Sequence, residues 1–238
     1  QELGTGTFDF TTLTNLNIDP GTQKLLFLGF FIAFAIKAPL VPFHTWLPDA
    51  AAASTPGTAV LLVGVLDKVG TFGMIKLCLP IFPAASEFYA PVIIVLCVVG
   101  IIYGALLAIG QTDLKRLIAY TSVSHFGFIG LGIFAMTTQG QSGSTFYMLN
   151  HGFSTGALFL IAGFLMTRRG SRLIADFGGV YRVAPVLAGL FLIAGLSSLS
   201  LPGMSSFISE FLVLVGTFEK YTVAAVIATL GILLAVLY

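Results

Sequence analysis

Long apolar runs constrain the fold of this chain more than any other feature of its sequence. A membrane-spanning helix needs about 20 mostly apolar residues, and seven segments of the 238-residue chain reach that length. Continuous runs favour helices over a strand barrel, whose segments alternate over about ten residues. The expected fold class is therefore an all-α polytopic membrane protein with about seven transmembrane helices. They lie at about 24–44, 59–80, 90–110, 117–137, 145–166, 183–218 and 221–238.

The composition supports this prediction. Only 9% of the residues are charged and 57% are hydrophobic, whereas a soluble chain carries roughly 25% charged residues. These values exclude a soluble globule and an intrinsically disordered chain. A formal net charge of +1 provides no electrostatic basis for binding nucleic acid. The chain begins at Gln1 without Met and ends at Tyr238 inside an apolar run, so we expect it to belong to a longer protein.

The sequence carries no motif for a cofactor or a metal ion. The GxGxxG, P-loop, CxxC and HExxH patterns are all missing. Cys78 and Cys97 lie inside apolar runs without metal-ligand spacing, which predicts buried thiols. His44 falls in a predicted loop and has no partner at ligand spacing. We therefore expect no cofactor and no metal in this chain.

The charges of the short loops predict an orientation in the membrane. In an alternating count of spans, six basic residues fall on one side and three on the other, so the first side is expected to be cytoplasmic. Residues 1–22 then form an external loop. The six are Lys115, Arg116, Arg168, Arg169, Arg172 and Arg182, and the three are Lys24, Lys76 and Lys220.

Two of the predicted spans contain helix-breaking residues. Lys37-Ala38-Pro39 and Pro42 interrupt the first span, and Leu201-Pro202-Gly203 interrupts the sixth. Unpaired backbone at membrane depth persists only where it is buried in protein or lines a wet cavity. Transporters place such broken helices at corresponding positions of two structural repeats. Four spans separate the two breaks, which predicts a repeat of five helices.

Three charged residues lie deep in predicted spans. A central charge costs about 2.5–3.5 kcal/mol on insertion scales, so Lys37, Lys68 and Glu210 are candidate functional residues. Lys37 could instead reach the surface from a helix end, and Glu210 could be purely structural. Asp67 precedes Lys68, so a structural ion pair is an alternative there. Adjacent helical residues point about 100° apart, which disfavours it.

Two histidines share this location. His125 lies near the middle of the fourth span and His151 lies in the fifth, each flanked by small or hydroxylated residues. Each could be an ordinary core residue with its hydrogen bonds satisfied. Together with the buried lysines and glutamate they favour a proton relay, because imidazole titrates near neutrality and can pass a proton between its two nitrogens.

These residues occur in stretches that resemble a known family. The stretches are KAPLVPFHTWLPDA (37–50), LDKVGTFG (66–73), QTDLKRLIAYTSVSHFGF (111–128), NHGFSTGALFL (150–160) and GLSSLSLPGMSSFISEF (195–211). They look like the antiporter-like subunits of respiratory complex I, which are related to subunits of multisubunit sodium/proton antiporters. Glu210, where the L-like and N-like sister subunits carry lysine, makes the chain most similar to the M-type members.

The resemblance implies a fold of roughly fourteen helices with two inverted five-helix repeats, each containing a broken helix. Residues 23–80 would be the last two helices of the first repeat. Residues 81–238 would be the second repeat, with its last helix truncated. The expected location is the bacterial inner membrane or an equivalent energy-converting membrane.

The resemblance also assigns roles to individual residues. Lys37 matches the lysine of the first broken helix, whose glutamate partner would lie on an earlier helix outside this sequence. Lys68 matches the connecting lysine, and Glu210 matches the terminal proton site. His125 and His151 match the histidines that bridge these two. Two positions depart from the family: Asp67, where an apolar residue is usual, and Ala51-Ala52-Ala53, where a His and a Glu are common.

The expected function is that of a proton-translocating membrane subunit of NADH:quinone oxidoreductase. Redox chemistry would occur in other subunits, and the partners would be the L-like and N-like neighbours and the lipid bilayer. A subunit of a cation/proton antiporter or of a membrane-bound hydrogenase is the alternative within the same superfamily. A structural membrane scaffold, whose buried charges only hold helices together, is the alternative from a different class.

Overall fold

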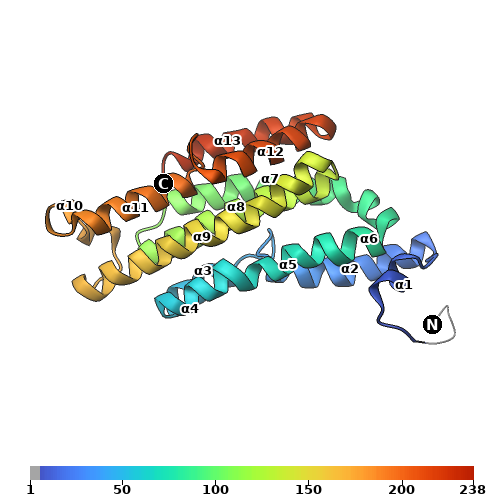
Figure 1. Cartoon of the computed structure of the whole chain (residues 1–238), viewed down its shortest axis with the longest axis horizontal. Coiled ribbons are helices and arrows are strands. Elements are labelled where there is room, and N and C mark those ends of the chain that lie inside the picture. The colour runs from blue at the N-terminus through green and yellow to red at the C-terminus, as the bar shows by residue number, and fades with distance from the viewer. Residues whose placement is uncertain (1–5) are drawn as a thin grey trace.

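Helices form nearly all the regular structure of the protein, as the sequence predicts. The computed structural model describes residues 6–238, which form an elongated bundle of helices packed side by side (Figure 1). Residues 6–238 contain no β-strand, and one isolated bridge joins Asp113 and Leu173. Residues 1–5, which include Glu2 of the predicted external loop, lie outside the described residues.

The first part of the chain contains one interrupted and one continuous helical segment. The continuous segment runs over 56–81 and is divided by two π-helical turns, at Leu62–Leu66 and Met74–Cys78. Its helices and those before it are α1 (Phe10–Thr14), α2 (Pro20–Lys37), α3 (Trp46–Ala53), α4 (Pro56–Leu61), α5 (Asp67–Gly73) and α6 (Leu79–Ile81).

The second part contains three long helices, one interrupted helix and a final short one. A 3₁₀ turn at 174–176 lies in the loop that follows α9. The helices are α7 (Pro83–Ile109), α8 (Leu114–Ala135), α9 (Thr138–Arg169), α10 (Val180–Val183), α11 (Pro185–Ser198), α12 (Ser205–Lys220) and α13 (Thr222–Ala235).

Local sequence signals start and end the long helices. The carboxylates of Asp19 and Asp113 accept hydrogen bonds from backbone amides in the first turns of α2 and α8. The Thr137 hydroxyl does the same for α9. Gly170, at a φ of 72°, ends α9 in a left-handed conformation that glycine adopts without steric cost. These caps satisfy backbone groups that a helix end leaves unpaired.

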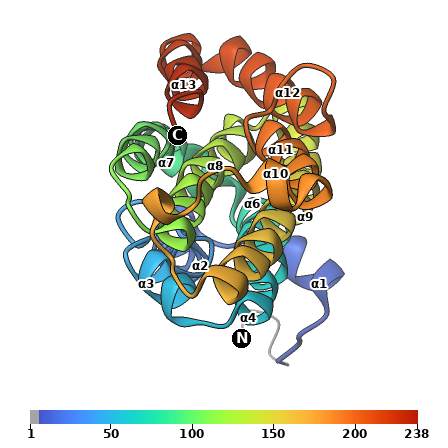
Figure 2. The ribbon, with the colours of Figure 1, turned by 90° about the vertical axis from the view of Figure 1, so that its left-hand side faces the viewer.

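Helix α8 lies at the centre of the bundle. The end view places it between α7, α9, α11 and the α2–α3 segment (Figure 2), and 89% of its most apolar stretch is buried. Glycines permit this close packing: a Cβ at Gly127 would lie 2.7 Å from the Cys97 carbonyl oxygen, and one at Gly132 would lie 2.7 Å from that of Gly140. Small residues are the usual means of bringing membrane helices together.

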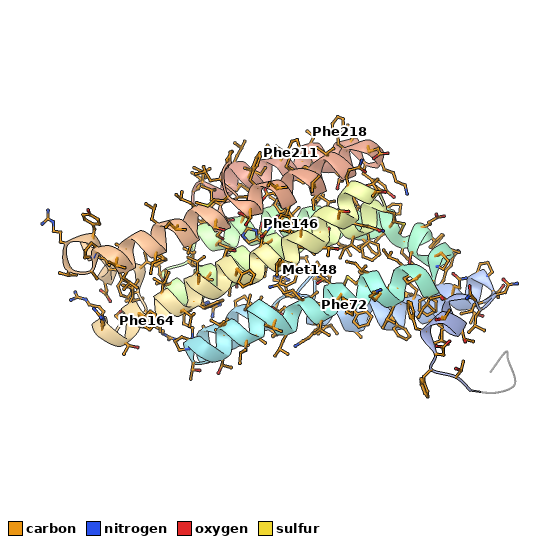
Figure 3. All side chains as sticks on the ribbon, in the orientation of Figure 1. Phe72, Phe146, Met148, Phe164, Phe211 and Phe218 are labelled. Carbon is orange, nitrogen blue, oxygen red and sulfur yellow. The ribbon has the colours of Figure 1, made fainter. Side chains whose placement is uncertain are left out.

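Within residues 6–238, four helices have the length and hydropathy of membrane spans: the 56–81 segment, α7, α8 and α9. They correspond to four of the seven predicted spans. The other three correspond to α2, to α11 with α12, and to α13. Large apolar side chains also cover the outer surface, and Phe72, Phe164, Phe211 and Phe218 are 53–57% exposed (Figure 3). Such a surface suits contact with lipid or with further apolar helices.

Both predicted interruptions are confirmed. Helix α2 ends at Lys37, and the next helix begins only at Trp46. Helix α11 ends at Ser198 and α12 begins at Ser205, after two residues with positive φ, Ser200 at 56° and Gly203 at 104°. The left-handed conformation at these two residues cannot continue a right-handed helix, so the helix is interrupted here.

Two local expectations are corrected. The segment between the first two predicted spans, 45–58, is not entirely loop, because it contains α3 (Trp46–Ala53), which buries Leu47 and Ala51. The 1–22 segment is not entirely loop, because it contains α1 and the first residues of α2. Helix α1 has five residues and α3 has eight, and helices this short are not recognised from hydrophobic periodicity.

The basic loops meet at one end of the bundle, as the alternating count predicts. Arg116 pairs with Asp49 at 2.6 Å, and Arg172 pairs with Asp113 at 3.3 Å. The Lys115 ammonium donates to the Ala52 carbonyl at 3.1 Å and also to that of Ser54. Backbone carbonyls at the C-terminal end of α3 therefore hold the Lys115 ammonium, and the Asp49 side chain of the same helix holds Arg116.

Candidate functional site

Four of the five predicted site residues lie close together in the bundle interior. Lys68 comes from α5, His125 from α8, His151 from α9 and Glu210 from α12. The two histidines and the glutamate are buried, and Lys68 is half-buried. Hydrogen bonds and one ring contact join them in the order Lys68, His151, His125 and Glu210, with one further residue between His125 and Glu210. The fifth predicted residue, Lys37, is not part of this chain of contacts.

Lys68 is held by a local irregularity of its own helix. The π-helical turn at Leu62–Leu66 departs from the regular bonding pattern, and the Lys68 ammonium donates to the Val63 carbonyl within it. The same nitrogen lies 2.7 Å from Nδ1 of His151 on α9. Lys68 also lines a groove between the 56–81 segment and α9, which carry Phe72 and Met148 (Figure 3).

The two histidines lie side by side. Their ring centroids are 5.2 Å apart and their planes are inclined by 57°. Nε2 of His151 is buried and has no hydrogen-bond partner among residues 6–238. Nε2 of His125 lies 3.3 Å from the Ser198 hydroxyl, at the last residue of α11. The pair therefore connects the 56–81 segment to the second interrupted helix.

A buried tyrosine completes the connection to the glutamate. The Tyr147 hydroxyl lies 2.6 Å from Nδ1 of His125 and donates to Oε2 of Glu210 at 3.1 Å. Because a hydroxyl has one proton, this arrangement makes Nδ1–H of His125 the donor to the tyrosine oxygen. Tyr147 is 1% exposed and Glu210 is 5% exposed. Neither group exchanges its hydrogen bonds readily with bulk water.

Sequence reasoning missed Tyr147, although a signal was present. Tyr147 precedes His151 by four residues, and residues four apart lie on the same face of a helix. A titratable side chain one turn from a buried histidine is therefore a candidate for the same site. Its aromatic ring alone is typical of an ordinary core residue, which is why hydropathy hides it.

Asn150 fixes the start of α12 against α9. Its side-chain amide donates to the Ser205 carbonyl at 3.1 Å and to the Ser209 hydroxyl at 3.2 Å. The Ser205 hydroxyl donates in return to the amide oxygen at 3.0 Å. These three bonds hold the second break in place, and Glu210 follows one residue after Ser209. The glutamate is thus positioned by contacts that begin on α9.

Lys37 lies at the end of α2, where the first break begins. Its ammonium is 6.0 Å from the centre of the Trp46 ring and makes no side-chain hydrogen bond with residues 6–238. The Trp46 indole donates to the Ile36 carbonyl at 2.9 Å, which folds the indole back over the end of α2.

Asp67 and Lys68 do not form the structural ion pair that was considered from the sequence. No ion pair within 4.0 Å joins them, and both carboxylate oxygens of Asp67 lack a hydrogen-bond partner within the described range. Cys78 and Cys97 are free and buried, as predicted. No cluster of three or more His, Cys, Asp or Glu residues in 6–238 has the arrangement of a metal site.

Interrupted helices and buried titratable side chains together define a class of protein. Charged residues inside a membrane are costly and mark ion or proton pathways, and broken helices are typical of transporters. The chain belongs to the family described as "NADH:quinone oxidoreductase/Mrp antiporter, TM", whose model matches residues 3–236. It is a multi-pass membrane protein with the antiporter-like helical fold of that family.

Several curated relatives are similar to this chain over nearly its whole length. NADH-quinone oxidoreductase subunit M of Mycobacterium tuberculosis is 61% identical over 98% of this chain and 43% of its own length. The subunit M of Rickettsia prowazekii is 47% identical over 97% of this chain and 48% of its own length. The subunit M of Pseudomonas aeruginosa is 44% identical over 99% of this chain and 46% of its own length. The chain therefore spans about half the length of these relatives.

Solved structures have the same fold. A chain of respiratory complex I from Thermus thermophilus with bound NADH matches with a TM-score of 0.94 and 35% identity, covering 99% of this chain and 50% of that one. A chain of the Mrp complex from Dietzia sp. matches with a TM-score of 0.88 and 26% identity, covering 98% of this chain and 44% of that one. An archaeal membrane-bound sulfane sulfur reductase has the same fold at 23% identity, with a TM-score of 0.88 and coverage of 98% and 49%.

Proposed function

We propose that this chain is part of a proton-translocating membrane subunit of NADH:quinone oxidoreductase. One observation carries the proposal: the series Lys68, His151, His125, Tyr147 and Glu210 extends through the bundle interior in contacts of 2.6–3.1 Å and one ring pair. The identity of 61% to a protein named as subunit M of that enzyme supports the choice of enzyme.

Each contact suits the transfer of a proton. The Lys68 ammonium gives a proton to Nδ1 of His151, and the imidazole releases one from its other nitrogen. The centroid separation of 5.2 Å between the rings requires ring rotation or one bridging water for the next transfer. His125 then passes a proton through the Tyr147 hydroxyl to Glu210, which releases it on the far side of the second break.

The architecture of the complete subunit is part of the same proposal. The seven segments, two of them interrupted, would be half of a fold of roughly fourteen helices with two inverted repeats. Residues 23–80 would close the first repeat and residues 81–238 would form the second. Residues 1–22 would connect to the preceding helix on the external side. The two breaks would then occupy equivalent positions, with Lys37 beside the first and Glu210 beside the second.

Partners and location follow from the enzyme that we propose. The chain would lie in the bacterial inner membrane between L-like and N-like subunits, and quinone reduction would occur elsewhere in the complex. Its residues supply proton carriers and no redox centre, so the cofactors would belong to other subunits. The driving force would reach this chain through its neighbours.

A subunit of a cation/proton antiporter is the second candidate. The match to the Mrp complex, at a TM-score of 0.88, favours it, but the identity of 26% is far below the value for the subunit M relatives. Proton movement coupled to NADH oxidation, independent of sodium, separates the first candidate from the second. A structural scaffold would show no change in proton movement when the buried charges are neutralised.

The experiment measures proton translocation by the assembled complex in membrane vesicles. Glu210→Gln keeps the shape of the side chain but cannot release a proton, and Lys68→Ala removes a carrier together with its desolvation cost. Both variants should assemble and lose most pumping, while Glu219→Gln, at an exposed acid on the same helix, should pump normally. Normal pumping in the first two, at equal complex content, would overturn the proposed function.

A further inference from the structure

Asp67 is a buried carboxylate that the series from Lys68 to Glu210 does not use. Its side chain is 0% exposed, and neither oxygen has a hydrogen-bond partner among the described residues. Burying an unpaired carboxylate costs several kcal/mol or more, so its position calls for a reason beyond packing. The neighbouring Lys68 does not provide one, because its ammonium bonds to Val63 and His151 instead.

The packing of α5 shows which way Asp67 faces. A Cβ on Gly70 would lie 2.6 Å from the Phe34 carbonyl oxygen and from the Ala38 nitrogen, so this face of α5 touches the end of α2. Further along, the rings of Phe82 and Phe30 are 5.5 Å apart, which makes the two segments antiparallel. Asp67 lies one turn before Gly70 on the same face. It therefore lies beside the non-helical chain that follows α2.

Lys68 faces a different element. Successive helical residues are rotated by about 100°, and this rotation turns Lys68 toward α9 while Asp67 faces the first break. The break that Asp67 faces begins directly after Lys37, the last residue of α2. The break also contains one other titratable residue, the buried His44. The carboxylate thus comes from the face of α5 that packs on the end of α2, where Lys37 lies, and it is adjacent to Lys68 in its own helix.

We propose that Asp67 carries protons between Lys37 and Lys68. The inference deepens the proposed function and rests on it. The Lys37 ammonium transfers a proton to the Asp67 carboxylate, which leaves a neutral amine and a carboxylic acid. The acid then transfers that proton to the neutral amine of Lys68 and becomes a carboxylate again. One proton moves in each step, by side-chain rotation or through a water molecule, and no other reactant takes part.

A fixed counter-ion is the alternative role for Asp67. It would remain ionised throughout and hold Lys68 in its charged form, so its removal would change the pH dependence of pumping without stopping it. A carrier must bind and release a proton in every cycle. Replacement by a group of the same shape that cannot titrate distinguishes the two roles.

The test uses the assembled complex in vesicles and measures protons moved per NADH oxidised across a range of pH. Asp67→Asn should lose at least tenfold in pumping at every pH, and Asp67→Glu should retain part of it. Glu87→Gln, at an exposed acid of α7, is the control and should pump normally. Asp67→Leu is a second neutral variant, which should assemble because it removes the cost of a buried charge.

Two results would overturn the inference. Pumping at the normal level with a shifted pH dependence in Asp67→Asn or Asp67→Leu would make Asp67 a counter-ion, and an unchanged profile would make it structural. Lys68→Ala, measured in parallel, separates this failure from that of the proposed function. If Lys68→Ala stops pumping while both neutral Asp67 variants pump normally, only the role of Asp67 fails. If all three pump normally, the proposed function fails as well.

Discussion

Tyr147→Phe tests the connection between the histidines and Glu210 by removing one oxygen atom. The substitution keeps the ring, whose edge contacts with His125 and Phe128 have centroid separations of 5.7 and 6.3 Å. It removes both hydrogen bonds of the hydroxyl, at 2.6 Å to His125 and 3.1 Å to Glu210. Assembly should therefore be preserved while the route for the proton is interrupted.

The size of the effect follows from the bonds that are lost. A hydrogen bond to a charged group contributes about 1.5–3 kcal/mol, and Glu210 is such a group when it is ionised. If the barrier to proton transfer rises by that amount, at 1.36 kcal/mol for each factor of ten, pumping slows by about 10- to 150-fold. The lower value applies where a water molecule replaces part of the lost contact.

Proton translocation per NADH oxidised, in vesicles with equal complex content, is the assay. Tyr103→Phe is the matched control, because this tyrosine also lies in a long helix, is 43% exposed and makes no side-chain hydrogen bond within residues 6–238. The control should behave like the unmodified complex. Pumping within twofold of normal in Tyr147→Phe would refute the assignment of the hydroxyl to the proton route.

Three further predictions concern the packing that positions the site. Gly70→Ala should lower the free energy of unfolding of the complex by about 1–3 kcal/mol, because its Cβ would lie 2.6 Å from backbone atoms at the end of α2. Gly29→Ala is the control and should leave that free energy unchanged, because its Cβ would have no atom within 4 Å. Gly203→Ala should lower the free energy of unfolding by about 1–3 kcal/mol, because a φ of 104° strains any residue with a Cβ. Equal melting curves for the variant and the unmodified complex would contradict this. Lys115→Met should lower the free energy of unfolding by about 1.5–3 kcal/mol and speed the hydrogen exchange of the α3 amides. The reason is that the Lys115 ammonium donates hydrogen bonds to carbonyls at the C-terminal end of α3. Unchanged exchange of the α3 amides would contradict that role.

Much of the fold was predictable because its signals are local in the chain. A run of about 20 apolar residues indicates a membrane helix wherever it occurs, and proline or glycine inside the run indicates a break. The breaks at Ala38 and at Gly203 were found in this way, and both are present. Lys68 and Glu210 were singled out because a charge inside an apolar run is costly wherever its helix lies. The short helix α3 was missed, since eight residues are too few for a periodic signal.

The tertiary structure decided how these residues are connected. Tyr147 joins His125 to Glu210 because three helices meet at one point, whereas in the sequence only its spacing of four residues from His151 distinguishes it from a core aromatic residue. Asp67 and Lys68 are neighbours in sequence, yet they face different helices, because the rotation per residue and the close approach at Gly70 set their directions. Composition and hydropathy determined that charges lie in the membrane. Only the packing of helix faces, which depends on contacts between distant parts of the chain, determined which groups those charges can reach.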